Sequence, residues 1–198
     1  MRIEGALTYA DVCRPSGALW RCAYNVMLVL AGSVLIAASA QAAVHLPFTA
    51  VPITGQTFAV LLLGGLFGAR RGVATVLAYI GEGAIGLPVF ANGAAGAAYL
   101  AGPTGGYLIG FVAAAWIVGR LAQRGWDRRF VTTAAAMTLG TIAIFVCGMA
   151  WLAMIVEPTQ VFLAGLIPFI PGAIVKIVVA AALLPSGWKV LALLRRGA

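Results

Sequence analysis

The sequence contains very little charge, and this scarcity limits the kinds of protein that it can encode. Only 9% of its 198 residues are charged, whereas 63% are hydrophobic and the mean hydropathy is +1.04. A soluble domain of this length needs far more charge to cover its surface. Apolar runs long enough to cross a bilayer recur along the chain. The composition therefore predicts an integral membrane protein and leaves no segment for a soluble catalytic domain.

Residues that build metal centres and catalytic sites are also scarce. The three cysteines, Cys13, Cys22 and Cys147, have no metal-ligand spacing, and His45 is the only histidine. An all-protein zinc site is therefore not expected. The sequence has no phosphate-binding P-loop and no nucleophile–base set. We expect no metal, no cofactor and no enzymatic activity, so any ATP hydrolysis must come from a partner.

Basic residues outnumber acidic ones and give a net charge of +8, which we attribute to membrane topology rather than to a nucleic-acid partner. The basic residues form groups between alternate apolar runs, as the positive-inside rule produces, and such groups attract anionic lipid headgroups of the bilayer. The three connections 44–55, 88–103 and 156–170 contain no Lys or Arg. This pattern places both termini in the cytoplasm. The groups are Arg2, Arg14 and Arg21; Arg70 and Arg71; Arg120, Arg124, Arg128 and Arg129; and Lys189, Arg195 and Arg196.

The apolar runs predict an all-α protein of the plasma membrane, with six transmembrane helices and irregular outer loops that form a ligand pocket. We expect a cytoplasmic tail over 1–21, one transmembrane domain over 22–194 and a short cytoplasmic tail over 195–198. The last span should be broken near Pro185. The predicted spans are 22–44, 56–68, 73–87, 104–118, 130–155 and about 168–194.

Two alternatives to this topology were weighed. The residues 38–42 (ASAQA) resemble a signal-peptidase site, but the leader is long and contains acids, so a retained helix is favoured. The run before Gly68 is short for a span, and a re-entrant hairpin over 51–87 is the rival interpretation. That hairpin would bring Arg70 and Arg71 towards the midplane at about 2.5–3.5 kcal/mol each, so spanning is preferred.

The stretch Gly86–Phe111 is too broken for one helix and too apolar for an ordinary solvated loop. It holds seven glycines, Pro88 and Pro103, and no charged residue. Prolines remove backbone donors, and glycines favour turns and close backbone approach. Irregular backbone at membrane depth is tolerated only where it is buried in protein or lines a cavity. The stretch therefore predicts one wall or lid of a binding site.

Each polar residue inside the spans, and one set of small residues, has two possible roles. Glu82 is either a functional acid or a protonated or lysine-paired residue of the interior. Lys176 either extends to the interface or faces a pocket, where a lone cation suits a carboxylate ligand. The small residues Ser33, Ala37 and Ala40 of the first span either pack within the monomer or form a docking face for a second membrane protein.

Four segments, in order, resemble the biotin-specific substrate-binding component (S component) of energy-coupling-factor (ECF) transporters, the BioY family. They are VPITGQTFAVLLLGGLFGARRG (51–72), IGLPVFANG (85–93), GPTGGYLIGF (102–111) and PFIPGAIVK (168–176). The resemblance implies a six-helix protein that binds biotin from outside. A transmembrane coupling subunit and ATPase subunits would then drive its release inside. An S component for another small vitamin is the nearest alternative.

The resemblance also implies which residues contact biotin. Lys176 would hold the carboxylate, and the amides of Gln56 and Asn92 would pair with the ureido ring. Phe90 and Tyr107 would supply apolar faces, and Thr54, Glu82 and Tyr99 are further candidates. The family usually has an acid three residues before the lysine, where this chain has Ala173. An acceptor for a ureido N–H is therefore missing or is supplied elsewhere, conceivably by Glu82.

Two other classes of function were considered. An intramembrane enzyme would need His45 and Glu82 close together in space. A passive channel would need a continuous polar lining, for which the chain has too few intramembrane polar residues.

Overall fold

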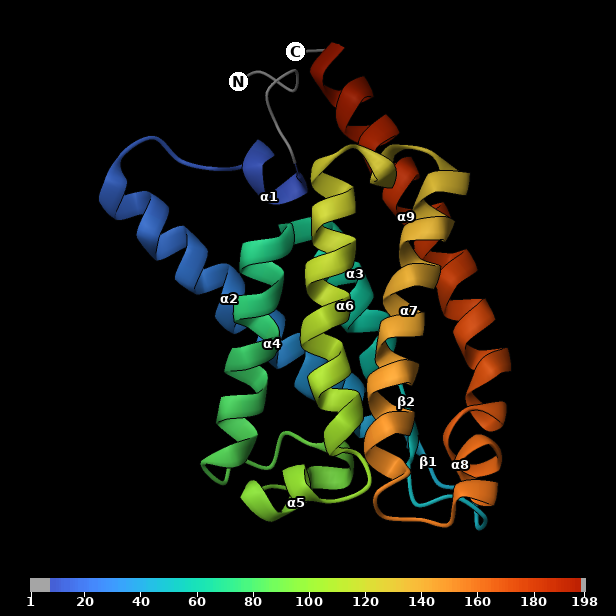
Figure 1. Ribbon diagram of the computed structural model, residues 1–198. Coiled ribbons are helices and arrows are strands. Elements are labelled where there is room, and N and C mark those ends of the chain that lie inside the picture. Colours follow the sequence, from blue (N-terminus) through green and yellow to red (C-terminus); the bar gives the residue numbers. More distant parts are fainter. Residues whose placement is uncertain (1–7, 197–198) are drawn as a thin grey trace.

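Apolar segments fold into helices in lipid because every backbone donor and acceptor must then find its partner within the segment. The computed structural model describes residues 8–196 and arranges such helices as a bundle (Figure 1). Within these residues, four helical stretches are long and apolar enough to cross a membrane. They are α2 (Ala18–Gln41), α6 (Gly105–Gln123), α7 (Phe130–Leu152) and the run Thr159–Leu194, which contains most of α9 (Ile170–Arg196).

Two shorter helices, α3 (Gln56–Phe67) and α4 (Ala69–Ala84), form a tight pair in the middle of the bundle. Gly68 joins them with a positive φ of 80°, a conformation that glycine adopts without a steric penalty. Packing at this turn is close, because the backbones of Gly68 and Ala69 lie directly against Gly119 of α6. The turn therefore reverses the chain without any exposed loop.

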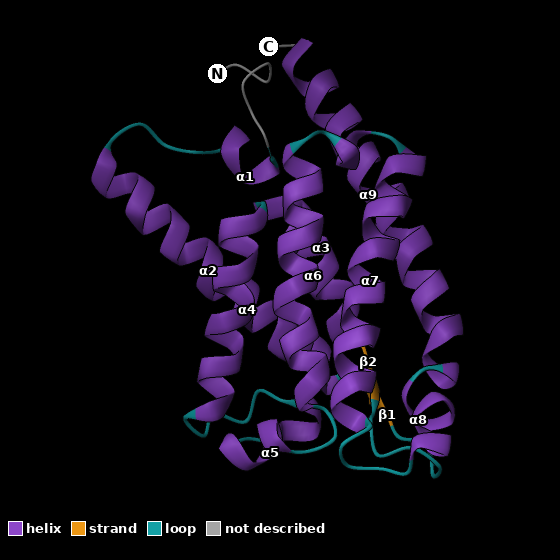
Figure 2. Cartoon of the chain, viewed as in Figure 1, coloured by secondary structure: helices purple, strands orange, loops and turns teal. Residues whose placement is uncertain are grey.

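The connections gather at the two ends of the bundle. We call one the loop end: it holds residues 42–55, 85–104 and 153–169, drawn as loops and short elements at the bottom of Figure 2. The other, the basic end, holds α1 (Tyr9–Val12), the α3–α4 turn, η3 (Trp126–Arg128) and the last turns of α9. The short elements of the loop end are β1 (Ala43–Val44), β2 (Ile53–Thr54), η2 (Ala91–Gly93), α5 (Ala97–Ala101), α8 (Pro158–Gly165) and η4 (Ile167–Phe169).

The two strands give the first outer connection a fixed shape. They pair antiparallel, with Ala43 opposite Thr54 and Val44 opposite Ile53. This places Thr54 directly before the start of α3, where its hydroxyl accepts a hydrogen bond from the Gln56 backbone N–H. The expected structured loop is therefore a small hairpin, and α2 ends at Gln41 rather than at Val44.

The stretch Gly86–Phe111 is not one uninterrupted helix, as its composition predicts: residues 86–104 are irregular, whereas residues 105–111 form the first turns of α6. Gly86, Gly93 and Gly96 all have positive φ angles, and only short helical turns form before α6 begins at Gly105. The indole N–H of Trp151 on α7 donates to the Gly102 carbonyl over 3.0 Å. This bond fixes the outer stretch to the end of α7.

The core lies between α3, α4, α6 and α7 and is closed by α9. The seam between α6 and α7 is tight at Gly110, where an added Cβ would lie 2.7 Å from the Ile144 Cα and 3.0 Å from its carbonyl oxygen. Small residues allow this backbone approach, which is how helices associate in lipid. Among the fully buried large side chains are Ile36, Leu61, Val76, Tyr79, Val118, Met137, Ile144 and Leu184.

Helix α1 ties several helices together at the basic end. Asp11 forms a 2.9 Å salt bridge with Arg71 of α4, and the Tyr24 hydroxyl of α2 donates to the Ala10 carbonyl over 3.0 Å. The ring of Tyr9 packs on Trp188 of α9 with the ring centroids 4.4 Å apart. The segment before α2 thus contains a short helix that packs on the bundle. Arg2 and Glu4 lie outside the described residues.

The predicted break at Pro185 is wrong. Helix α9 continues through this proline to Arg196. Prolines are tolerated in membrane helices where neighbouring groups satisfy the freed backbone. Pro185 frees the carbonyl four residues earlier, and the helix is held on either side of it: the Tyr9 hydroxyl donates to the Leu184 carbonyl, and Leu184 and Trp188 are both buried against the bundle. Packing on α1 and α7 therefore holds the helix together at this point.

Candidate functional site

A cavity opens inside the bundle towards the loop end. The cavity has a volume of about 60 Å³ and opens at its mouth. Helices α3, α6, α7 and α9 supply most of the walls, and β2, α5 and η4 supply the mouth. The lining residues are Val51, Pro52, Ile53, Thr54, Gln56, Thr57, Leu61, Tyr99, Thr104, Tyr107, Leu108, Phe111, Thr141, Ile144, Phe145, Phe169, Ala173 and Lys176.

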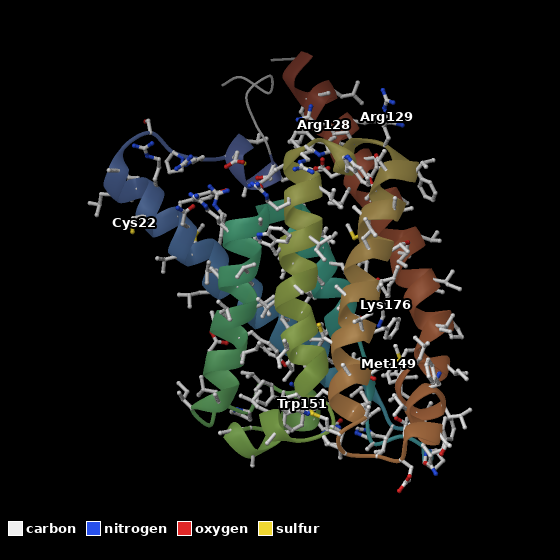
Figure 3. The ribbon with its side chains drawn as sticks, viewed as in Figure 1. Cys22, Arg128, Arg129, Met149, Trp151 and Lys176 are labelled. Carbon is white, nitrogen blue, oxygen red and sulfur yellow. The ribbon has the colours of Figure 1, made fainter. Side chains whose placement is uncertain are left out.

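Lys176 is the only charged residue among those that line the cavity. It lies on the inner side of α9, between this helix and α7 (Figure 3). Its ammonium group donates to the Thr54 carbonyl over 2.6 Å and to the Thr57 hydroxyl over 2.8 Å. An ammonium has three donors, so one remains for a ligand. Among residues 8–196 no acid forms a salt bridge with it, and Glu82, its suggested counter-ion, bonds elsewhere.

Gln56 belongs to a chain of hydrogen bonds that leads away from the cavity. Its Oε1 accepts from the Thr54 hydroxyl over 2.8 Å, and its Nε2 donates to the Tyr79 hydroxyl over 2.5 Å. Tyr79 in turn donates to the Val89 carbonyl over 3.2 Å. The amide is therefore held in one orientation, with its second N–H and second lone pair still available.

Two tyrosines contribute to the cavity at different depths. Tyr107 of α6 is almost fully buried, and its hydroxyl donates to the Gly165 carbonyl over 2.7 Å. Tyr99 of α5 lies at the mouth and stacks on Phe90, with the ring centroids 4.7 Å apart. The tyrosines thus offer ring faces to a ligand while their positions are fixed by other contacts.

The structure brings five of the eight predicted contacts onto the cavity wall: Thr54, Gln56, Tyr99, Tyr107 and Lys176. The other three residues lie elsewhere. Phe90 is fully buried between Tyr79 and Tyr99.

Asn92 and Glu82 are the other two, and each has a different neighbour. Asn92 sits in a left-handed turn with φ 57°, and its Nδ2 lies 3.0 Å from the Nε2 of His45. Glu82 accepts a 2.8 Å hydrogen bond from the Ser33 hydroxyl. His45 and Glu82 therefore contact different residues, which gives no support to an intramembrane enzyme that uses both.

The small residues of α2 pack within the chain. Ser33 and Ala40 are fully buried, and Ala37 is half-buried against the core. Ser33 donates a hydrogen bond to Glu82 of α4. Its neighbour in α2, Gly32, lies so close to α4 that an added Cβ would meet Thr75. Of the two interpretations of this stripe, internal packing is the one that the structure supports. The prediction that Ser33 and Ala40 form a docking surface is therefore wrong, because both side chains are buried within the chain.

The sequence alone did not identify many of the residues that line the cavity, although their spacing is regular. Thr104, Tyr107, Leu108 and Phe111 recur at i, i+3, i+4 and i+7 along α6. Thr141, Ile144 and Phe145 repeat this spacing on α7, as Phe169, Ala173 and Lys176 do towards α9. Each set forms one face of a helix. A polar residue at one end of an otherwise largely apolar face, as with Thr104, Thr141 and Lys176, is the signal that could have found them.

The arrangement suits non-covalent binding of a small amphipathic anion. One ammonium group can pair with a carboxylate, several hydroxyls and one amide can satisfy polar ring atoms, and the remaining walls are aliphatic or aromatic. A pocket of this kind fixes the orientation of its ligand by a few polar groups and gains affinity from apolar burial.

Comparison with known proteins identifies the family. A sequence profile described as the BioY family matches residues 14–193. The chain belongs to the BioY family. A BioY relative from Rhizobium etli, named a biotin transporter, is 35% identical over 167 residues, which cover 80% of this chain and 89% of the relative. A biotin transporter BioY from Thermotoga maritima is 37% identical and covers 70% of this chain and 81% of its own length.

A solved structure supports the fold assignment. The crystal structure at 2.1 Å of the S component for biotin from an ECF-type ABC transporter matches with a TM-score of 0.79. The match covers 88% of this chain and 95% of the other, at 24% sequence identity. Together with its apolar helices, BioY membership makes this chain a multi-pass protein of the cell membrane.

Proposed function

We propose that this chain is the biotin-binding subunit of a vitamin uptake transporter and captures biotin from outside the cell in the cavity of the loop end. It works as a binding protein rather than as an enzyme. The names of its BioY relatives point to biotin as the ligand. The observation that carries the proposal is Lys176, which among the described residues is the one charged side chain on the wall of this cavity.

The chemistry of biotin fits the cavity wall. Its valerate carboxylate would meet the free N–H of Lys176, in a charge-assisted bond. Its fused rings would lie between aromatic and aliphatic side chains such as Phe111, Ile144 and Phe145. The amide of Gln56 can both donate and accept, but Gln56 adjoins Thr57 and so lies at the carboxylate end of a ligand held by Lys176. The ureido ring would need further hydrogen-bonding groups deeper in the cavity. A ligand that lacks the ureido ring would leave such buried groups unpaired and would be rejected.

We propose six spans, formed by α2, α3, α4, α6, α7 and α9, with the basic end in the cytoplasm. The Arg residues at the starts of α4 and α7 and at the end of α6 support this orientation. At a rise of 1.5 Å per residue, the 12 residues of α3 reach about 18 Å, short of the ~30 Å hydrocarbon core. Residues 42–55 and 85–104 would then lie within the outer leaflet, and the ligand would bind at membrane depth.

ATP-driven release would need the coupling and ATPase subunits of an ECF module. The exposed side of α2 is the surface we propose for this contact, because Met27 and Val34 point away from the bundle and are 57% and 65% exposed. Ala37 lies at the edge of this side. An Ala37→Leu substitution should therefore impair uptake in cells and leave biotin binding by the purified chain unchanged. Equal loss of both activities would contradict this assignment.

Binding of radiolabelled biotin to the purified chain, with no partner subunit present, tests the proposal. We expect saturable binding that unlabelled biotin displaces and that a thiamine or riboflavin competitor does not. Absence of saturable biotin binding would refute the proposed function. Displacement by another vitamin at equal concentration would point instead to an S component of different specificity.

A further inference from the structure

One polar side chain of the cavity has no role in the account above. Thr141 lies near the middle of α7 and is 8% exposed. It is the lining residue of α7 furthest from the loop end, as Leu61 is on α3 and Phe111 is on α6. Leu61 and Phe111 are apolar, and the ammonium group of Lys176, the innermost lining residue of α9, bonds to Thr54 and Thr57 nearer the loop end. Thr141 therefore introduces a hydroxyl between apolar neighbours.

The hydrogen bonding of Thr141 defines what this hydroxyl can offer. Its single O–H donates to the Met137 carbonyl, one turn earlier on the same helix, over 2.8 Å. A hydroxyl has one donor and two acceptor lone pairs, so the donor is used and the acceptor capacity remains. Thr141 therefore presents an acceptor, fixed in direction by the helix, to whatever fills the inner cavity.

The position of Thr141 relative to Lys176 suits a ligand with two polar ends. The Lys176 ammonium lies 2.8 Å from the Thr57 hydroxyl of α3. Gly140, which precedes Thr141, packs on Leu61, one turn further along α3. The two polar groups thus differ in depth by about one helical turn, ~5.4 Å, in addition to the width of the cavity. A carboxylate at Lys176 would place the other end of the ligand near Thr141.

We propose that Thr141 accepts a hydrogen bond from a ureido N–H of biotin and so determines the specificity of the inner cavity for a ring that carries an N–H donor. This inference rests on the proposed function. A buried N–H without an acceptor is strongly unfavourable in an apolar site. The threonine would thereby supply the acceptor that Ala173, an alanine in the wall of α9, does not.

Binding measurements with a matched set of variants and ligands test this role. Thr141→Val removes the hydroxyl at nearly constant volume, and Thr141→Ser keeps it. Thr138→Val is the matched control, because Thr138 makes the same bond to the carbonyl four residues earlier (Ala134) but is exposed on the outer side of α7. The ligands are biotin and its two cyclic carbamate analogues, in each of which one ureido N–H is replaced by oxygen.

We expect Thr141→Val to bind biotin about 10-fold more weakly or worse, with Thr141→Ser within about threefold of wild type and Thr138→Val unchanged. Wild type should discriminate against one carbamate, and Thr141→Val should bind that carbamate as well as wild type does. Wild-type affinity of Thr141→Val for biotin would overturn the inference. Equal binding of biotin and both carbamates by wild type would overturn it without any variant. Failure of wild type to bind biotin would instead contradict the proposed function.

Discussion

Removing the charge of Lys176 is the most informative single perturbation of the cavity. In a Lys176→Met variant the side chain keeps its length and its apolar stem but loses the ammonium group. The chain has only one other lysine, Lys189, which lies on the same helix at the basic end and is exposed. Lys189→Met is therefore a control with the same change of charge and of residue type.

The expected magnitude follows from the contacts of the ammonium group. Hydrogen bonds to charged groups contribute about 1.5–3 kcal/mol, so loss of one bond to the biotin carboxylate should weaken binding by about 10- to 150-fold. The variant also loses the bonds from Lys176 to Thr54 and Thr57. That loss acts on the cavity itself, so it should affect a neutral ligand of the same shape to the same extent.

Isothermal titration of the purified chain with biotin and with biotinamide separates the two effects. Biotinamide has no carboxylate, so its affinity should fall far less than that of biotin in Lys176→Met. Neither ligand should distinguish Lys189→Met from wild type. The same loss for biotin and biotinamide would refute the carboxylate role and would leave Lys176 as a structural residue that holds the start of α3.

Three further predictions concern residues outside the cavity wall. Glu82→Gln should leave biotin affinity within about threefold of wild type, because Glu82 bonds to a neighbouring helix; a selective loss in titration would return it to the site. Gly110→Ala should lower the thermal unfolding midpoint by several degrees, as an overpacked seam costs about 1–3 kcal/mol, whereas Gly81→Ala, with open space around it, should not. Asp127→Asn should unfold at a higher temperature than wild type near pH 7. Burial raises the pKa of Asp127, so its neutral form is favoured in the folded state and the advantage of the variant should disappear as the pH falls below that pKa; a difference independent of pH would contradict this explanation.

The sequence is informative where composition restricts the backbone. The glycines and prolines of 86–104 predict an irregular segment, and the structure has one. Lys176 could be singled out because a cation within a span needs a reason to be there. These conclusions depend on which backbone conformations and environments a residue type can adopt. Neither depends on how each helix is rotated about its axis in the bundle.

The direction of individual side chains could not be predicted in the same way. In water, an apolar stripe marks the buried side of a helix. In lipid, the outer side is apolar as well, so periodicity does not distinguish Ile142, which is half-exposed, from Ile144, which is buried. For the same reason the rotation of α4, which turns Glu82 towards Ser33, was not visible in the sequence. The prediction of a break at Pro185 failed for a different reason, because the helix around it packs against segments that are distant in sequence, among them Tyr9 of α1.

The glycine-lined seam between α6 and α7 limits how the binding site can be altered. Where two backbones touch, as at Gly110 and Ile144, there is no side chain left to shorten. A larger ligand therefore cannot be accommodated by trimming residues along this seam. Changes of ligand size, in evolution or by engineering, would have to be made in the side chains that line the cavity, such as Leu61 of α3 or Phe111 of α6, which can be replaced by smaller ones.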